Sequence, residues 1–319
     1  MASLLILAYN EDKTIENLLN NLYPHFDNVI LLDDNSSDFT YKKCQDYLDK
    51  ESFIYHKNKK NLGAGRSFEV GLDIFNQLDS EYLIKIDGDN QFDIHDILFL
   101  SNIGQDENFD FIKCDRFWKH GIKGKIPFVR YLGNALASLL IKLTTGNWKI
   151  NDPLNGLFFM SKKITSNFSV KKLFKRYGYP FYLIYYVLNI SKKNKLKIGQ
   201  YQNIVTYGDE KSQLKANTML FKLLYFTIVS YYRKIKIKLR YSNLQFSALI
   251  DIISQLFLFL SLYSIIRIIF ILESVPKGSW VIISLMSLLI SIILLFISQN
   301  IENDIESNNI TKLKNNEFN

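Results

Sequence analysis

The sequence predicts an α/β fold, in which helices cover a mostly parallel sheet, followed by two helices that cross a membrane. Three observations support this prediction. Short apolar runs alternate with amphipathic stretches through residues 1–115, polar clusters follow several of these runs, and two long apolar spans lie late in the 319-residue chain. Alternating strands and helices are typical of parallel sheets, and a span of about 20 apolar residues can cross a bilayer.

The first third of the chain contains five apolar runs with the length of buried strands, separated by stretches with helical spacing. Residues 116–212 are rich in Lys, Tyr and Phe and predict a less regular region. The expected strands are 4–8, 29–32, 53–56, 82–86 and 111–114, and the expected helices are 14–22, 40–48, 65–78 and 95–103.

Composition limits the partners that this chain can have. The 39 Lys and Arg exceed the 31 Asp and Glu, giving a net charge of +8. No zinc-ligand spacing or basic recognition helix accompanies this charge, so a nucleic acid partner is not predicted. Cys44 and Cys114 lie in dissimilar contexts, so we expect reduced thiols facing the cytosol rather than a disulfide framework. Residues 1–8 are too short for a signal peptide and are expected to form a strand.

The last third of the chain predicts a membrane anchor. Residues 252–272 and 280–298 can each cover a hydrocarbon core of roughly 30 Å at about 1.5 Å per residue. A buried hairpin in a soluble domain is the alternative, and the small number of charges in both spans argues against it. Arg267, inside the first span, is expected either to snorkel or to face the partner helix.

A basic segment precedes the two spans. Residues 233–240 alternate basic and aliphatic residues, which fits a strand with one charged face or, beside two spans, a segment lying on anionic lipid. Five basic residues in this segment contrast with a connecting loop that has only Lys277. The α/β domain and both termini are therefore predicted to be cytoplasmic, in a multi-pass protein of the cell (inner) membrane.

Four regions follow from these patterns. Residues 1–213 form the α/β domain, 214–245 an amphipathic basic juxtamembrane segment, and 246–299 a two-helix transmembrane hairpin. The polar, Asn-rich residues 300–319 are expected to be a disordered tail.

Polar residues gather directly after the expected strands. Because ligands bind beyond the carboxyl ends of the strands in such sheets, this placement predicts one nucleotide site. Asp87 and Asp89 flank Gly88 at the end of a buried strand, and paired carboxylates can hold Mg²⁺ or Mn²⁺ against a diphosphate. Acidic triplets are also common in solvated turns and helix caps, so the position after a strand carries the argument.

Five motifs, taken in order, resemble those of family 2 glycosyltransferases with a GT-A fold. The branch that they resemble most is that of dolichyl-phosphate mannose synthases and bacterial polyprenyl-phosphate glycosyltransferases. Bacterial members of this branch carry two membrane helices after the catalytic domain. The resemblance covers roughly residues 3–215, and its motifs are residues 8–11, 32–40, 61–65, 87–91 and 152–156.

The resemblance implies a nucleotide-diphospho-sugar transferase domain of the Rossmann-like GT-A type. It implies an inverting, metal-dependent transfer of a sugar from a nucleotide-diphosphate sugar to a polyprenyl phosphate, which would be undecaprenyl phosphate in a bacterial host. Such a reaction serves glycan or cell-surface polysaccharide synthesis. The implied cofactor is a divalent cation, Mg²⁺ or Mn²⁺.

The resemblance also implies roles for individual residues. Catalysis falls to Asp87, Asp89, Arg116 and Arg130. The metal would lie at Asp87, Asp89 and Gln91, and the acceptor at Arg116, Arg130, Asp152 and Asn155. The residues implied in nucleotide-sugar binding are Ala8, Tyr9, Glu11, Leu32, Asp34, Asp87, Gly88, Asp89, Gln91 and Lys211.

Some of these motif residues have a structural alternative. Helix capping is an alternative for Glu11, and it is the favoured interpretation for Asp38. Gly63 and Gly65 would serve as well to end a strand and open a helix as to contact a substrate.

The chain departs from the family pattern in its second half. Residues 181–186 are uncharged where the family carries an acidic residue. Tyr207 and Gln213 stand where the late basic loop has arginine and lysine, so Lys211 is expected to supply the positive charge.

Three other functions compete with the one that the resemblance implies. A processive polysaccharide synthase would need more spans and a Gln-x-x-Arg-Trp motif, and the sequence has neither. A membrane-anchored transferase acting directly on a glycan or protein, and a non-catalytic transferase-like membrane subunit, both stay open. The sequence also leaves open the sugar, the UDP or GDP donor, the ion and the oligomeric state, a homo-oligomer included.

Overall fold

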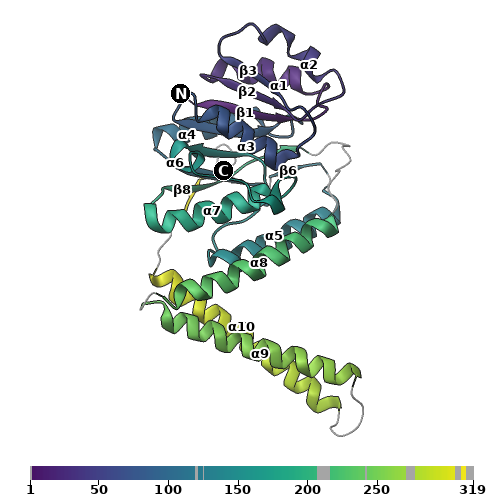
Figure 1. Cartoon of the computed structure of the whole chain (residues 1–319), viewed down its shortest axis with the longest axis vertical. Coiled ribbons are helices and arrows are strands. Elements are labelled where there is room, and N and C mark those ends of the chain that lie inside the picture. Colours follow the sequence, from purple (N-terminus) through teal and green to yellow (C-terminus); the bar gives the residue numbers. More distant parts are fainter. Residues whose placement is uncertain are drawn as a thin grey trace. The chain divides into compact units, whose positions relative to one another are not determined.

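The computed structural model describes residues 2–118, 121–124, 126–206, 216–240, 243–270, 277–305 and 310–313. The chain forms two compact units (Figure 1). Unit 1 comprises Met1–Tyr225 with Asn309–Asn319, and unit 2 comprises Phe226–Asn308. The division falls inside one long helix, α8 (Ala216–Lys238).

Unit 1 is built on a sheet of eight described strands in the order β10-β8-β5-β7-β4-β1-β2-β3. Only β7 among them runs antiparallel to its neighbours, so the predicted mostly parallel sheet is confirmed. The strands are β1 (Ser3–Ala8), β2 (Val29–Asp33), β3 (Phe53–Lys57), β4 (Tyr82–Asp87), β5 (Phe111–Asp115), β7 (Phe158–Ser161), β8 (Ile198–Gln202) and β10 (Ile310–Leu313).

Helices and a small second sheet complete unit 1. The second sheet pairs β6 (Ile122–Lys123) in parallel with β9 (Val205–Thr206). Short 3₁₀ helices occupy Tyr23–His25, Gln45–Tyr47 and Lys172–Phe174. The α-helices are α1 (Ile15–Leu22), α2 (Thr40–Lys43), α3 (Ala64–Phe75), α4 (Ile94–Asp106), α5 (Phe128–Thr145), α6 (Lys162–Thr165) and α7 (Tyr179–Asn194).

All five strands predicted in the first third are confirmed to within one residue at each end. The reason is their burial. Every residue of β1, β2 and β5 is buried, and strands covered on both faces are continuous apolar runs in sequence.

The helix expected over residues 40–48 is wrong as a single element. α2 ends at Lys43, and a 3₁₀ helix follows, because Cys44 leaves the helical region with φ −100° and ψ 0°. The less regular region expected over 116–212 is also wrong, since it holds α5, with 18 residues, and α7, with 16. Much of α7 is buried among aromatic side chains, so it has no single apolar stripe that the sequence could reveal.

The tail expected to be disordered contains ordered elements. The last helix of unit 2 continues to Ile305, and β10 pairs in parallel with β8, from Ile310 opposite Ile198 to Leu313 opposite Tyr201. Polar composition alone did not predict this pairing. An open sheet edge presents unpaired backbone groups that a short extended segment can satisfy whatever its side chains.

Unit 2 contains two helices long and apolar enough to cross a membrane, α9 (Gln245–Phe270) and α10 (Lys277–Ile305). The most apolar 18-residue stretches of the two helices have mean hydropathies of 2.0 and 2.9, and only 28% and 22% of these stretches are buried. Core helices of a soluble domain would be mostly buried. The exposed apolar surface therefore favours the membrane interpretation over the buried hairpin.

The helices α9 and α10 lie side by side (Figure 1). Serine pairs join them along their length. The serines recur every seven residues on each helix, the spacing of one face of a left-handed helix pair. In each pair a hydroxyl also donates to the backbone carbonyl of its partner, at 2.8–3.0 Å. The pairs are Ser247 with Ser298, Ser254 with Ser291, and Ser261 with Ser284, with hydroxyl separations of 3.2, 3.2 and 3.3 Å.

This serine pairing predicts a size-dependent response to substitution. Ser254→Ala should lower the stability of the detergent-solubilised protein by about 0.6 kcal/mol, the average for one hydrogen bond between membrane helices. Ser254→Leu should cost several times more, because the larger side chain must push the helices apart. Thermal unfolding measures both. Leu256→Ala, at an exposed position of the same helix, is the control and should change little.

A buried ionic cluster lies at one end of the hairpin. The Lys238 ammonium is 2.8 Å from Asp251 Oδ2 and 3.0 Å from Glu302 Oε2, and Lys234 is 2.6 Å from the same Glu302 oxygen. Each of these two acids on the spanning helices is thus paired with a lysine of α8, which offsets the cost of removing the charges from water.

The basic segment is helical as far as Lys238, so the strand alternative is wrong. Two of its five basic residues point inward to the ionic cluster. The other three, Arg233, Lys236 and Arg240, are exposed at helical spacing. Arg267 faces the partner helix, with its guanidinium 5.1 Å from the centre of the Trp280 ring, as one of the two alternatives predicted.

Candidate active site

The polar clusters meet at one edge of the sheet, as the sequence predicted. Leu7 lies opposite Asp87, and Ala8 lies opposite Asp33, so β1, β2 and β4 end at the same level. Because β7 runs antiparallel to β4, the loop that enters β7 comes to this edge too. The loop of residues 151–157 therefore joins the carboxyl ends of the parallel strands.

Asp87 is the last residue of β4 and its side chain is 39% exposed. One of its oxygens, Oδ1, is 2.5 Å from the ammonium of Lys85, a fully buried residue of the same strand. The carboxylate thus lies between solvent and a buried positive charge.

Residues 87–91, named the acidic turn here, comprise the last residue of β4 and the turn that follows it. Asp89 Oδ1 accepts a hydrogen bond from the Gln91 backbone N–H at 3.2 Å. Gly88 donates to the Leu7 carbonyl at 2.9 Å, and its own carbonyl accepts from Thr14 Oγ1 at 2.7 Å. The turn is thereby fastened to the loop after β1.

The loop after β1 brings Glu11 to the same turn. A methyl group on Gly88 would lie 3.3 Å from Glu11 Cγ and 3.4 Å from Ala8 Cβ. Ala8 is buried, and Tyr9 is 37% exposed beside it. The structure therefore brings Ala8 and Glu11 to the acidic turn, with Tyr9 between them in the chain.

Asp34 has a different environment from the one expected. Its buried carboxylate accepts from the backbone N–H groups of Leu62 and Gly63, both at 2.7 Å, and from Asn58 Nδ2 at 2.9 Å. Asp34 thus fixes the glycine-containing loop. Gly63 has φ +88°, a backbone conformation that favours glycine, so the structural role considered for it is supported.

Leu32 is fully buried within β2, so the structure does not bring its side chain to a surface that a ligand can reach. Asp38 has the structural role favoured for it, because it satisfies the first backbone N–H of α2, although the N-cap residue itself is Phe39. The Asp38 carboxylate accepts from the Thr40 backbone N–H and hydroxyl, at 3.0 and 2.6 Å, and from the Asp12 N–H at 3.1 Å. Burial alone would raise the pKa of Asp38, but these hydrogen bonds outweigh it and the pKa is lowered.

Three of the four predicted acceptor residues, Arg116, Asp152 and Asn155, form a buried cluster after β5. Arg116 holds Asp152 through two contacts, from Nε at 2.9 Å and from Nη2 at 3.0 Å. Asn155 Nδ2 lies 3.3 Å from Asp152 Oδ2 and donates to Asn203 Oδ1 at 3.0 Å. Arg116 is therefore a buried partner of Asp152, and the pair positions the loop that leads to β7.

Arg130 lies in the first turn of α5, partly exposed. The same helix contacts this buried cluster, because Ser138 Oγ accepts from the Asp152 backbone N–H at 3.2 Å. Arg130 is eight residues before Ser138, or about 12 Å along the helix. Lys211 lies outside the described residues.

Two residues of this edge were not predicted from the sequence. Lys85 could have been noticed as a lysine in an otherwise apolar strand, two residues before an acid and so on the same face. Asn203 is fully buried and accepts from Asn155. No sequence pattern distinguished Asn203 from an ordinary loop asparagine.

The oxygen donors of the acidic turn fit a hard divalent cation. Among the described residues no three His, Cys, Asp or Glu side chains gather into a complete metal site. Asp87, Asp89 and Gln91 supply oxygen donors only, and Mg²⁺ or Mn²⁺ usually completes its coordination with substrate phosphate and water. The residues therefore fit a cation shared with a substrate.

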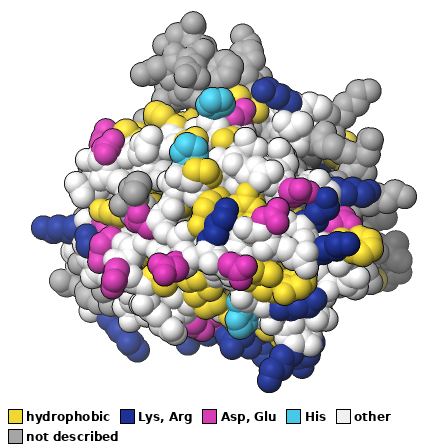
Figure 2. Space-filling model, turned by 90° about the horizontal axis from the view of Figure 1, so that it is seen from above, with side chains coloured by type: hydrophobic (Ala, Val, Ile, Leu, Met, Phe, Trp, Pro, Cys, Tyr) yellow, Lys and Arg dark blue, Asp and Glu magenta, His cyan; other side chains and the backbone are white. Residues whose placement is uncertain are grey.

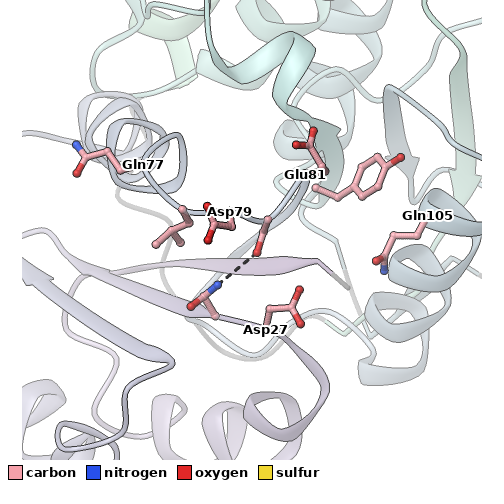
Figure 3. A pocket seen from close by; sticks show the side chains of 9 residues that line it. Asp27, Gln77, Asp79, Glu81 and Gln105 are labelled. Atoms are coloured by element: carbon pink, nitrogen blue, oxygen red, sulfur yellow. Dashed lines mark hydrogen bonds between the residues drawn. The ribbon is translucent and has the colours of Figure 1, made fainter.

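A separate open cavity of about 590 Å³ lies at the opposite edge of the sheet. Figure 3 shows Asp27, Asp79 and Glu81 around it, beside Gln77 and Gln105. Asp27, Asp79 and Glu81 stand before β2 and β4, at the amino ends of these strands. The cavity is therefore distinct from the acidic turn.

Charge on the surface gives no sign of a nucleic acid interface on the face drawn in Figure 2. Acidic and basic side chains are interspersed there among the described residues. Nucleic acid binding typically requires a continuous basic patch or stripe.

The fold and the site together define the class of protein. Residues 3–165 match the family model of glycosyl transferase family 2. The chain therefore belongs to this family and has a GT-A fold, with C-terminal helices that include two candidate transmembrane helices.

Named relatives come from archaea and bacteria. The chain is 29% identical over 237 residues to a UDP-N-acetylglucosamine–dolichyl-phosphate N-acetylglucosaminyltransferase of Methanococcus voltae, covering 70% of this chain and 92% of the relative. It is 27% identical over 138 residues to a cholesterol galactosyltransferase of Borreliella burgdorferi, covering 40% and 37%.

Solved structures with this fold include glucosyl-3-phosphoglycerate synthase from Mycobacterium tuberculosis. Its complex with UDP aligns with a TM-score of 0.54 at 17% identity, covering 72% of this chain and 80% of that chain. Its complex with Mn²⁺, UDP and phosphoglyceric acid aligns with a TM-score of 0.54 at 16% identity, covering 72% and 78%.

Proposed function

We propose that this glycosyltransferase moves a sugar from a nucleoside-diphosphate sugar to a polyprenyl phosphate, with inversion, at the cytoplasmic face of the membrane. One observation carries the proposal. The acidic turn at Asp87 and Asp89 and the buried Arg116–Asp152 loop meet at one sheet edge, in a chain that also has two helices apolar enough to span a bilayer. Donor and lipid acceptor chemistry would thus occur in one membrane-anchored domain.

The donor would bind at the acidic turn. Ala8 and Glu11 lie against this turn, and Tyr9 would line the approach beside them. Asp89 lies where a diphosphate would sit in a sheet of this kind. UDP in two complexes of one solved protein with the same fold, one of them also with Mn²⁺, supports this assignment.

A divalent cation fits the same turn. Asp87, Asp89 and Gln91 would hold it, and when bound it would neutralise charge on the departing nucleoside diphosphate. Asp87, Asp89 and Gln91 would also orient the diphosphate end of the donor. The loop that contains Leu62 and Gly63, held by Asp34, lies beside them at the same edge of the sheet.

The acceptor phosphate would be the nucleophile. One of its oxygens forms a bond to the anomeric carbon while the bond from that carbon to the diphosphate breaks, so the configuration inverts. The second pKa of a phosphate is about 6, so the acceptor is already largely ionised and needs little from a general base. Positioning by Arg130 and by the Asp152–Asn155 loop would then supply most of the rate.

The anchor would orient the enzyme toward the cytoplasm. Arg233, Lys236 and Arg240 stay exposed after the other two basic residues are paired, and basic residues concentrate on the cytoplasmic side of spanning helices. The same three charges suit contact with anionic lipid headgroups.

A donor screen tests the proposal. Purified protein is incubated with polyprenyl phosphate, Mn²⁺ and each of several radiolabelled UDP- and GDP-sugars, and the product is extracted into organic solvent. Label in the organic phase is the expected result. Transfer to a glycan, protein or sterol, with none to polyprenyl phosphate, would contradict it.

Replacing Arg130 tests the acceptor side alone. Arg130→Ala should raise the KM for polyprenyl phosphate roughly tenfold to a hundredfold, because a hydrogen bond to a charged group contributes about 1.5–3 kcal/mol. The KM for the donor should change little. Arg130→Lys keeps the charge but loses the planar fork, so its effect should be intermediate. A selective loss of donor affinity would argue against the assignment.

A further inference from the structure

Strand β4 carries a lysine that the proposed function has not used. Lys85 lies two residues before Asp87, so both side chains leave the same face of the strand. Lys85 has no exposed surface. Burying an ammonium costs free energy unless the charge is paired and hydrogen-bonded, so this position implies specific partners.

The partners of Lys85 come from the donor side and the acceptor side at once. Its ammonium is 2.5 Å from Asp87 Oδ1 and donates to the Gly156 carbonyl at 3.1 Å. It also lies 5.5 and 5.4 Å from the ring centres of Phe158 and Tyr179, within range of cation–π attraction. The buried Lys85 ammonium thus contacts both Asp87, at the end of β4, and the loop that enters β7.

The second oxygen of Asp87 is confined by the same loop. A methyl group on Gly156 would overlap Asp87 Oδ2 and lie 3.2 Å from the Lys85 ammonium. Only the absence of a side chain at Gly156 leaves room for this close approach. The ammonium orients one oxygen of the carboxylate, and the Gly156 backbone limits the other.

We propose that Lys85 is a positioning residue, whose ammonium fixes the Asp87 carboxylate and joins it to the loop of residues 151–157. The donor-side acid and the acceptor-side loop would then be held in one arrangement by one buried charge. The inference rests on the proposed function, because it takes Asp87 to face the donor diphosphate and its cation. Groups that orient a metal-facing ligand typically change metal affinity or activity by about 10–100-fold when removed.

The test measures nucleotide binding rather than turnover. Full-length Lys85→Met in detergent is titrated by calorimetry with UDP and with GDP, with and without Mn²⁺. We expect Mn²⁺-dependent binding to weaken about tenfold or more. Asp87 remains partly exposed and can be hydrated once Lys85 is gone, so the variant should still fold.

A second variant displaces Asp87 from the other side. Gly156→Ala places a methyl group against Asp87 Oδ2, and the overlap is with the movable end of a side chain. The fold should therefore persist, and Mn²⁺-dependent nucleotide binding should weaken in the same direction as in Lys85→Met.

Lys113 provides the matched control. It is also fully buried in a strand of the same sheet, and its ammonium donates to the Cys114 backbone carbonyl at 2.5 Å. Lys113→Met should lower thermal stability yet bind the nucleotide with Mn²⁺ as the wild type does. If Lys85→Met behaves in the same way, its lysine is merely structural and the inference is overturned.

The outcomes separate this inference from the function on which it rests. A wild-type protein that binds neither UDP nor GDP with Mn²⁺ contradicts the proposed function and the inference together. If the wild type binds and Asp89→Ala does not, while Lys85→Met and Gly156→Ala bind at full affinity, only the inference fails.

Discussion

Asp89→Ala should reduce sugar transfer by at least about a hundredfold while the protein stays folded and inserted in the membrane. The loss is large because electrostatic stabilisation of a leaving group in a preorganised site commonly contributes that much. Asp89 is partly exposed at the turn after β4, and its hydrogen bond from the Gln91 N–H is local to that turn. Its removal should therefore affect catalysis far more than folding.

Asp93 supplies the control for this experiment. It lies four residues later and caps α4, accepting from the His95 backbone N–H at 2.9 Å. Asp93→Ala should cost about 1 kcal/mol of stability, as lost caps do, and leave transfer largely intact. The rate of label entering the organic phase and the elution profile in detergent measure the two effects. Full activity of Asp89→Ala would exclude the metal and diphosphate role assigned to this acid.

Asp152→Ala should destabilise the protein by about 3–5 kcal/mol, because it leaves the buried Arg116 guanidinium without its paired charge. Asp152 is fully buried and accepts hydrogen bonds from Arg116 Nη2 at 3.0 Å and from the Arg116 backbone N–H at 3.2 Å. It also has φ +47°, a conformation that alanine adopts with strain. For a unit of this size the melting temperature should fall by roughly 10 °C.

Two variants bracket this second effect. Asp152→Asn tolerates the same backbone conformation and keeps one oxygen acceptor, so its loss of stability should be smaller. Asp73→Ala, at an exposed position of α3, should leave the melting temperature close to that of the wild type. A melting temperature unchanged in Asp152→Ala would mean that the Arg116–Asp152 pair adds nothing to stability.

The sheet was more predictable from the sequence than the helices that follow it. Strands such as β1 and β2 are buried throughout, so their short apolar runs between turn residues indicate strands directly. α7 is enclosed by aromatic neighbours, so its sequence shows no single apolar face. α2 ends because the backbone angles of Cys44 are not helical, and no residue pattern in the sequence marks that end. β10 depends on an open edge of β8, which no local pattern reveals.

The candidate site was predictable in position and less so in detail. The acidic turn and the loop of residues 151–157 do share an edge, because strand ends and one antiparallel strand bring them there. The environments of Asp34 and Arg116 could not be foreseen. Their partners are distant in sequence. Asp34 accepts from the Gly63 backbone N–H, and Arg116 pairs with Asp152. Leu32 was expected at the pocket because of its motif and proved to be interior.

The pairing of β10 with β8 means that the hydrophobic hairpin is an insertion within a domain rather than an appendage to it. A protease that cut the polypeptide inside the hairpin would leave two fragments still joined by backbone hydrogen bonds across one sheet edge. Reporter fusions placed before β1 and after β10 should consequently report the same compartment. A truncation that removes the hairpin together with everything after it also strips an edge strand, so an engineered soluble form should retain residues 310–313 through a linker.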